Sequence, residues 1–276
     1  MNNPLGVMQG RLLPKYQGRY QAHPVGYWAD EFPRAAALGL DCIEFILDHN
    51  DAERNPLLSA TGREAIRCVS AKTGVRVLSV CADYFMEAPL HAADEGVAQA
   101  SGEVLGRLIL AAQALGIRDI VIPCVDQSSL SDQAQVDRFR QRLAEHLPLA
   151  ERCQVNLALE TDLNPADFAE LLARLDHPRV TVNYDIGNSA ALGYDPADEL
   201  AAYGERISDI HIKDRVRGGG SVRLGSGHAD IPGFIAKLAR FDYTGPFIMQ
   251  AYRDEEGEKI FREQLEWVHR YLDEPA

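Results

Sequence analysis

Short apolar runs rich in β-branched residues recur along the whole chain, and each is followed by a segment with a helical pattern. Several of these runs are continuously hydrophobic, which is typical of parallel strands that are buried on both faces. The pattern therefore predicts alternating strands and helices. The expected strands are Leu5–Gln9, Cys42–Ile46, Val75–Cys81, Ile120–Val125, Val155–Leu159, Val180–Tyr184, Ile207–Ile212 and Phe247–Met249.

The segments between these strands repeat with the period of a helix that buries one face. One helix is expected to begin at Asn164-Pro165, because asparagine is a favourable N-cap residue and proline fits the first helical turn. Its apolar residues lie at i, i+3, i+4 and i+7 and so share one face. They are Phe168, Leu171, Leu172 and Leu175.

Eight strand–helix units with right-handed crossovers close most economically into a (β/α)8 TIM barrel, an α/β fold. An open, doubly wound sheet is the alternative, but such sheets usually carry a glycine-rich GxGxxG loop after the first strand. Here that position reads Met8-Gln9-Gly10-Arg11, which does not supply the loop. Because no proline- or serine-rich linker divides the chain, we predict one TIM-barrel domain over residues 1–276.

The composition is that of a soluble globular protein, since 46% of the 276 residues are hydrophobic and 25% are charged. No apolar run approaches the roughly 18 residues that cross a bilayer, so no membrane association is expected. The N-terminus lacks the basic and apolar regions of a signal peptide, and the five cysteines form no CxxC pair, which together predict a cytoplasmic protein. A net charge of -13 argues against a nucleic-acid partner.

Two connections are longer than the others, residues 11–28 and residues 214–230. In a TIM barrel both follow strands and lie on the catalytic face, where long loops become lids and substrate walls. The first is rich in aromatic and basic residues, and the second contains two glycine-rich stretches. We expect both loops to border the substrate site, with packing of the aromatic residues onto the barrel rim as the alternative.

Polar residues end the strands of the second half of the predicted barrel: Glu160, Asp185, His211 and Gln250. Glu160 and Asp185 are 25 residues apart, and Asp185 and His211 are 26 apart, which is about one strand–helix unit each time. The four side chains should therefore stand at similar heights on neighbouring strands. Oxygen ligands with a single nitrogen suit Mn²⁺, Mg²⁺ or Co²⁺, and Zn²⁺ also accepts them. We predict one bound divalent metal ion.

Five motifs in this chain resemble the xylose isomerase-like TIM barrels, a superfamily of sugar and sugar-phosphate isomerases and epimerases. The motifs are residues 6–12 (GVMQGRL), residues 41–45 (DCIEF), Leu159-Glu160, residues 184–188 (YDIGN) and residues 209–214 (DIHIKD). Ketose and ketose-phosphate 3-epimerases look most similar, L-ribulose-5-phosphate 3-epimerase-like proteins especially. The resemblance spans essentially the whole chain. It implies an enzyme that acts on a sugar or sugar phosphate, with a metal held by Glu160, Asp185, His211 and the residue of the last strand.

The chemistry that the resemblance implies is proton transfer beside a metal-polarised carbonyl. One carboxylate removes the proton, and a second returns one to the other face. Those epimerases carry glutamate on the last strand, where this chain has Gln250. An amide oxygen binds a metal more weakly and cannot act as a base, so Glu160 is the proton-transfer group of the expected catalytic pair, Glu160 and Gln250.

Three reactions stay open because of this glutamine. A one-base transfer by Glu160 gives aldose–ketose isomerisation. Glu44 or Asp83, at the ends of the second and third strands, could supply the second base for epimerisation. The metal could also drive elimination, as in a dehydratase or lyase that acts on a keto sugar or an inosose. We favour an isomerase or epimerase of a ketose or ketose phosphate.

Two other classes of function are less favoured. A phosphodiesterase like endonuclease IV, which the superfamily also contains, needs more histidine ligands and a surface less acidic than a net charge of -13 gives. A non-catalytic sugar-binding barrel could have lost its chemistry through Gln250. The sequence leaves a homo-oligomer open.

Other polar residues of the expected catalytic face are candidates for substrate binding. Arginine and lysine suit a phosphate or carboxylate, and the amides and carboxylates suit sugar hydroxyls. The candidates are Gln9, Arg11, Glu44, Asp83, Lys213, Arg215, His228 and Arg253.

Overall fold

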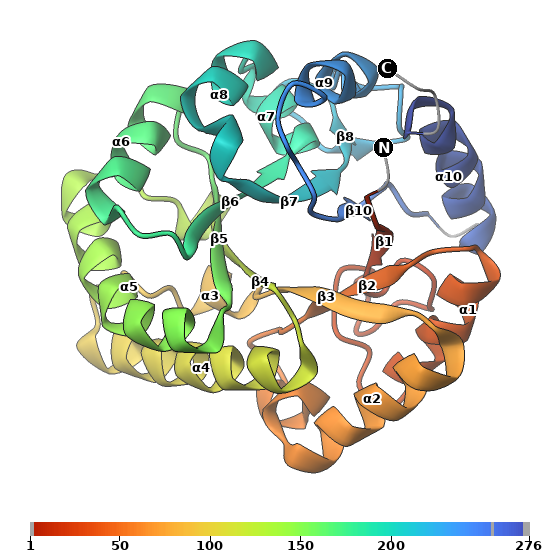
Figure 1. Cartoon of the computed structure of the whole chain (residues 1–276), viewed down its shortest axis with the longest axis horizontal. Helices are drawn as coiled ribbons and strands as arrows, with labels where there is room; N and C mark the ends of the chain where they lie inside the picture. The colour runs from red at the N-terminus through yellow and green to blue at the C-terminus, as the bar shows by residue number, and fades with distance from the viewer. Residues whose placement is uncertain (1–2, 255–256, 273–276) are drawn as a thin grey trace.

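Eight parallel strands close into a barrel in the order β1-β10-β7-β6-β5-β4-β3-β2, and helices surround them (Figure 1). This computed structural model describes residues 3–254 and 257–272. The predicted TIM barrel is confirmed. Its strands are β1 Leu5–Met8, β2 Cys42–Ile46, β3 Arg76–Cys81, β4 Asp119–Cys124, β5 Asn156–Thr161, β6 Val180–Asp185, β7 Ile207–Ile212 and β10 Phe247–Met249.

All eight predicted strands are present, and their ends lie within two residues of the predicted ones. β5 and β6 run further than their apolar pattern indicated, so Glu160 lies inside β5 and Asp185 is the last residue of β6. The backbone of Glu160 is in register with Pro123, and that of Asp185 with His211. Backbone pairing does not depend on side-chain polarity, and therefore the polar ends continue the strands.

Helices follow the strands as the periodicity predicted. The helix expected after Asn164 is α6, where the side chain of Asn164 accepts hydrogen bonds from the backbone N–H groups of Ala166 and Asp167. Among the described residues, no helix combines the length and the apolar character that crossing a membrane requires. The helices are α1 Glu31–Ala37, α2 Ala60–Thr73, α3 Tyr84–Glu87, α4 Glu95–Leu115, α5 Gln133–Cys153, α6 Pro165–Leu175, α7 Ile186–Leu192, α8 Pro196–Tyr203, α9 Ile231–Leu238 and α10 Glu258–Leu272.

The barrel interior is packed with small and medium apolar side chains and is not a pore. The outward faces of the strands pack instead under the surrounding helices, in a separate and larger core. Fully buried polar side chains such as Asp119 and Asp209 share the interior with this apolar cluster, and the strand ends carry further polar side chains to the catalytic face. The interior cluster consists of Met8, Cys42, Ile46, Cys81, Val121, Ala158 and Ile248.

The loop after β1 is tied to α1 by one buried carboxylate. Glu31 accepts hydrogen bonds from the backbone N–H groups of Gly10, at 2.8 Å, and Leu12, at 2.9 Å. These two bonds fix the start of the loop, which then runs over the barrel mouth to the 3₁₀ helix η1 at Trp28–Asp30. A carboxylate in α1 thus shapes a segment of the catalytic face.

The long connection after β7 forms a short antiparallel hairpin, which the sequence pattern did not predict. Its strands are β8, Asp214–Arg215, and β9, Ser221–Val222. The Asp214 carboxylate accepts hydrogen bonds from the backbone N–H groups of Gly227 and Ala229. Two-residue strands leave no periodicity in a sequence, so this pairing was invisible there.

Candidate functional site

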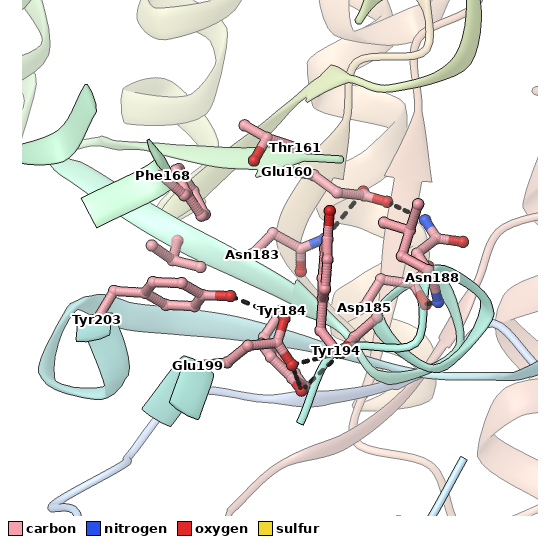
Figure 2. A pocket seen from close by; sticks show the side chains of 13 residues that line it. Glu160, Thr161, Phe168, Asn183, Tyr184, Asp185, Asn188, Tyr194, Glu199 and Tyr203 are labelled. Atoms are coloured by element: carbon pink, nitrogen blue, oxygen red, sulfur yellow. Dashed lines mark hydrogen bonds between the residues drawn. The ribbon is translucent and has the colours of Figure 1, made fainter. Parts of the chain in front are cut away.

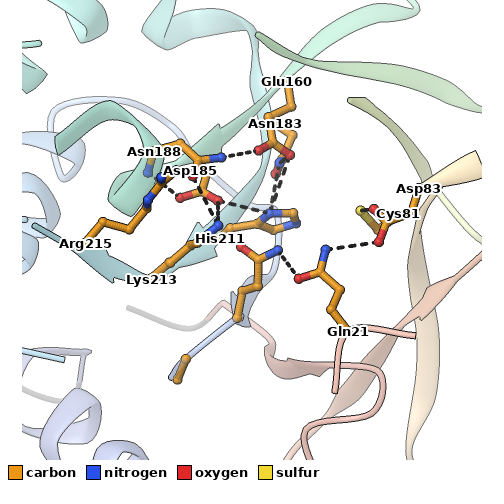
Figure 3. A network of polar contacts seen from close by, with 12 residues as sticks. Gln21, Cys81, Asp83, Glu160, Asn183, Asp185, Asn188, His211, Lys213 and Arg215 are labelled. Carbon is orange, nitrogen blue, oxygen red and sulfur yellow. Dashed lines mark hydrogen bonds and ion pairs between the residues drawn. The ribbon is translucent and has the colours of Figure 1, made fainter. Parts of the chain in front are cut away.

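Three of the predicted metal ligands meet at the carboxyl ends of the strands (Figure 3). Glu160, Asp185 and His211 each offer one ligand atom, and these atoms lie within 4.8 Å of one another. Nδ1 of His211 is 3.8 Å from Oε2 of Glu160 and 3.9 Å from Oδ2 of Asp185. All three side chains are buried. Two carboxylate oxygens and an imidazole nitrogen therefore surround one point, which is a donor set suited to a divalent cation.

The orientation of the His211 ring is set by Glu44. Nε2 of His211 lies 2.8 Å from Oε1 of Glu44 and donates its proton there. The other oxygen of Glu44 accepts a 2.5 Å hydrogen bond from Oγ of Ser79. Such a carboxylate behind a histidine is the usual support of a metal-binding imidazole. Nδ1 is the ring nitrogen on the side of Glu160 and Asp185, and it accepts a 3.1 Å hydrogen bond from Nδ2 of Asn183. A metal ion bound at Nδ1 would take the place of that hydrogen bond.

The negative charge of the carboxylates in this cluster favours the binding of a cation. Burial lowers the pKa of His211, but Glu44, Glu160 and Asp209 outweigh burial and raise this pKa to about 10. Burial, with a smaller contribution from Asp185, raises the pKa of Glu160 to about 7. The raised pKa of His211 reflects the negative charge of the carboxylates around it, whereas that of Glu160 comes mainly from burial. A divalent ion beside Nδ1 would supply the missing positive charge, so the residues present fit a metal.

Two asparagines hold the carboxylate of Glu160. Nδ2 of Asn183 donates to Oε2 at 3.0 Å, and Nδ2 of Asn188 donates to Oε1 at 2.6 Å. The amide oxygen of Asn188 in turn accepts hydrogen bonds from Nζ of Lys213, at 3.1 Å, and Nη1 of Arg215, at 2.8 Å. The positively charged side chains of Lys213 and Arg215 thus orient the amide of Asn188, which in turn donates to Glu160. Neither asparagine was predicted from the sequence, although Asn183 precedes Asp185 by two positions and so shares its strand face.

Asp185 joins β6 to α7. Its Oδ1 accepts the backbone N–H of Asn188 at 2.8 Å and caps the helix. Its Oδ2 lies 3.3 Å from Nζ of Lys213 and faces His211. The helix cap fixes one oxygen, so the other is directed at the cluster.

Gln250 follows β10 directly and is 4% exposed. Its Nε2 donates a 2.9 Å hydrogen bond to Oε1 of Gln21. Its own Oε1 is buried and has no hydrogen-bond partner among the described residues. Leaving a buried acceptor unpaired costs about 1–3 kcal/mol, so this oxygen marks the place of a missing partner. An amide oxygen is also a ligand that hard divalent cations accept.

The remaining candidates divide into those near the cluster and those away from it. Asp83 is half-buried, and its Oδ2 accepts a 3.1 Å hydrogen bond from Nε2 of Gln21. Gln9 is buried, and its Oε1 accepts the backbone N–H of Ile46 at 3.0 Å. Nε of Arg11 donates to the carbonyl oxygen of Ala251 at 3.1 Å. All three side chains therefore make hydrogen bonds within the protein at the barrel mouth.

Arg253 and His228 make their contacts with loop segments. The guanidinium of Arg253 lies over the ring of Tyr20, 4.6 Å from its centroid, and donates to the carbonyl oxygen of Leu13 at 3.2 Å. His228 is exposed, and its Nδ1 accepts the backbone N–H of Arg217 at 3.1 Å. These contacts organise the two long loops.

A second set of ligand atoms, from Glu44, Asp209 and His211, also lies within 4.8 Å. In that set the ring nitrogen is Nε2, which already donates to Glu44. On the Glu160 side, Nδ1 is an acceptor whose partner is a neutral amide, that of Asn183. A metal ion can displace an amide more readily than the Glu44 carboxylate, so this side is the better metal site.

A small cavity of about 20 Å³ lies beside Glu160 and Asp185 (Figure 2), which is room for about one water molecule. Deeper in its wall, Glu199 accepts hydrogen bonds from the hydroxyl groups of Tyr184, at 2.6 Å, and Tyr203, at 2.9 Å. Because Tyr184 directly precedes Asp185, this buried network anchors the end of β6.

Comparison with known proteins places this geometry in a family context. A family model described as "Xylose isomerase-like TIM barrel" matches residues 32–271. The L-ribulose-5-phosphate 3-epimerase UlaE of Salmonella paratyphi C is 32% identical over 261 residues, which cover 91% of this chain and 88% of that protein.

Two solved structures share the fold across nearly the whole chain. A D-psicose 3-epimerase crystallised in the presence of D-fructose has a TM-score of 0.76 and 16% identity, covering 98% of this chain and 99% of the other. A xylose isomerase-like TIM barrel protein from Mycobacterium smegmatis, in complex with magnesium, has a TM-score of 0.73 and 21% identity, covering 98% and 97%.

Proposed function

The chain belongs to the xylose isomerase-like TIM barrel family, and from that premise we propose that it is a divalent-metal-dependent isomerase or epimerase of a ketose or ketose phosphate. One observation carries the proposal. Glu160 is a buried carboxylate with its pKa raised to about 7, held by two amides, and its Oε2 lies 3.8 Å from Nδ1 of His211. Such a group can remove a proton at neutral pH.

The proton would come from the carbon next to the sugar carbonyl. A metal ion, for which Mn²⁺, Mg²⁺ or Co²⁺ is proposed with Zn²⁺ as the alternative, would polarise that carbonyl and stabilise the charge that develops on its oxygen. Glu160 accepts the proton, and Asn183 and Asn188 keep its carboxylate in place during the transfer. Lys213 and Arg215 add positive charge on the same side, which favours an anionic substrate such as a ketose phosphate.

Asp83 is the proposed second proton-transfer group. Glu44 is fully buried, and both of its oxygens are hydrogen-bonded, to His211 and Ser79. Asp83 also accepts two hydrogen bonds, from Gln21 and Cys81, but it does not support the His211 ring, it is only half-buried, and desolvation by its surroundings raises its pKa. Figure 3 shows Asp83 beyond Gln21, apart from the Glu160 carboxylate. An epimerase requires a proton-transfer group on each face of the reacting carbon, and Asp83 is proposed for the face opposite Glu160.

Solvent isotope exchange tests this function. The protein, loaded in turn with Mn²⁺, Mg²⁺, Co²⁺ and Zn²⁺, is incubated in D₂O with a panel of ketoses and ketose phosphates. We expect deuterium beside the carbonyl of at least one sugar, and no uptake after the metal is removed with EDTA. Absence of uptake across all sugars and metals would contradict the proposal and leave a sugar-binding barrel.

Metal affinity should fall as the pH is lowered, because protons compete for the ligand atoms. The pKa of about 10 for His211 predicts a loss of about tenfold per pH unit between pH 10 and pH 7. Below the pKa of about 7 for Glu160, a second proton competes, and the loss steepens to about a hundredfold per unit. Titration calorimetry with Mn²⁺ at pH 6, 7 and 8 measures the slope. A pH-independent affinity over this range would show that these two groups are not ligands.

A further inference from the structure

Gln21, in the loop after β1, joins three groups of the site through one carboxamide (Figure 3). Its Oε1 accepts hydrogen bonds from Nε2 of Gln250, at 2.9 Å, and from Nη2 of Arg11, at 3.1 Å. Its Nε2 donates to Oδ2 of Asp83 at 3.1 Å. One half of the amide therefore faces donors, and the other half faces an acceptor.

The outer partners fix which way this amide points. Arg11 can only donate hydrogen bonds, so the atom of Gln21 that faces it must be oxygen. The Asp83 carboxylate accepts, so the atom that faces it must be nitrogen. Arg11 is itself 8% exposed and held by the carbonyl oxygen of Ala251. Turning the Gln21 amide over would place two donors together at Arg11 and two acceptors together at Asp83.

The fixed oxygen of Gln21 in turn sets the orientation of Gln250. An acceptor 2.9 Å away requires the NH₂ half of Gln250 on that side, which leaves Oε1 on the other side, buried and without a partner. We propose that Gln21 is a positioning residue that fixes the amide of Gln250 with its oxygen directed at the metal site. This inference rests on the proposed metal site, and it assigns to the β1 loop a role in metal binding.

The same contacts explain why an amide, and not a carboxylate, stands after β10. A glutamate at position 250 would set a carboxylate oxygen against Oε1 of Gln21, and two acceptors at that distance repel each other. Gln21 and Gln250 are in this sense a matched pair, and Arg11 and Asp83 determine their polarity.

A double-mutant cycle separates positioning from a general structural effect. The variants are Gln21→Met, Gln250→Glu and the double variant, and Mn²⁺ affinity is measured for each at one pH. Methionine has nearly the length of glutamine but neither accepts nor donates strongly, so in the parent it frees the Gln250 amide to turn. We expect an affinity loss of about five- to tenfold, the effect of one hydrogen bond. A carboxylate has two equivalent oxygens, and therefore Gln21→Met should leave affinity unchanged or improved in the Gln250→Glu background.

Equal losses in both backgrounds, or no loss in the parent, would overturn the inference. A second readout needs no metal, since the side-chain amide protons of Gln250 can be followed by NMR in the apoprotein. We expect one proton of the pair to be shifted downfield by its bond to Gln21, and to lose that shift in Gln21→Met. If the parent binds no Mn²⁺, the proposed function fails, and the orientation is judged by this signal alone, an unchanged signal contradicting it.

Discussion

Replacing Glu160 with glutamine should reduce deuterium exchange into the substrate by about 10²- to 10⁴-fold, the contribution typical of a general base. The substitution keeps the size of the side chain but removes its ability to accept a proton. Both neighbouring amides, Asn183 and Asn188, now donate to it. One of them would lose an acceptor, so a small loss of stability is also expected. The rate is measured by NMR as deuterium wash-in under saturating Mn²⁺.

The matched control is Asp185→Asn, which also removes one carboxylate from the cluster. Asp185 caps α7 and faces His211, and it has no proposed role in proton transfer. Its loss should weaken metal binding, and excess Mn²⁺ should restore most of the exchange. Excess metal cannot replace a base, so Glu160→Gln should stay inactive at any metal concentration. Recovery of Glu160→Gln by metal would show that Glu160 acts only as a ligand.

The barrel and three members of the cluster were predictable because they follow from spacing alone. One strand–helix unit separates Glu160 from Asp185 and Asp185 from His211, and closure of the sheet brings such positions to one height. The structure adds that their ligand atoms lie within 4.8 Å. Periodicity specifies which face of a strand a side chain occupies, and that suffices when the ligands stand on strands.

Residues whose placement depends on loop path or on hydrogen-bond polarity were not predictable. Gln21 lies in a loop without periodicity, and its position depends on contacts with Arg11 and Asp83. Glu44 and Asp83 were equal candidates for the second base, because both were expected at strand ends. The structure corrects this for Glu44, which is the third of the five residues of β2, whereas Asp83 lies two residues beyond β3. Only coordinates show that Glu44 is enclosed between His211 and Ser79.

The glutamine after β10 changes the charge of the site as well as its chemistry. Glu160 and Asp185 together balance a divalent ion, whereas a third carboxylate would leave one negative charge in excess. With Gln250 as a neutral ligand, the proposed site would hold its ion less tightly but would leave that ion a stronger electrophile. The hydrogen bond from Gln250 to Gln21 supports the proposal that a neutral amide stands at this position of the metal site. Proton transfer would then depend on other carboxyl groups, those of Glu160 and Asp83.

Replacing Asp83 with asparagine should therefore abolish epimerisation, by about 10²-fold or more, while deuterium exchange on one face persists. If Glu160 removes and returns a proton on its own face, the sugar still takes up deuterium but its configuration no longer inverts. Chromatography of the two epimers, run beside the exchange measurement, separates the two outcomes.

Glu44→Gln is the control that distinguishes the two candidate bases. Glu44 supports His211, so this variant should bind metal more weakly and recover inversion when Mn²⁺ is raised. Asp83→Asn should not recover, because the amide oxygen of the new asparagine can still accept the hydrogen bond from Gln21 and so keep the orientation of Gln250, whereas the proton-transfer group is lost. Inversion at the parental rate in Asp83→Asn, with its loss in metal-saturated Glu44→Gln, would make Glu44 the second base. Inversion that survives in both variants would exclude each of them, and a parent that exchanges deuterium without ever inverting would be a one-base isomerase that relies on Glu160.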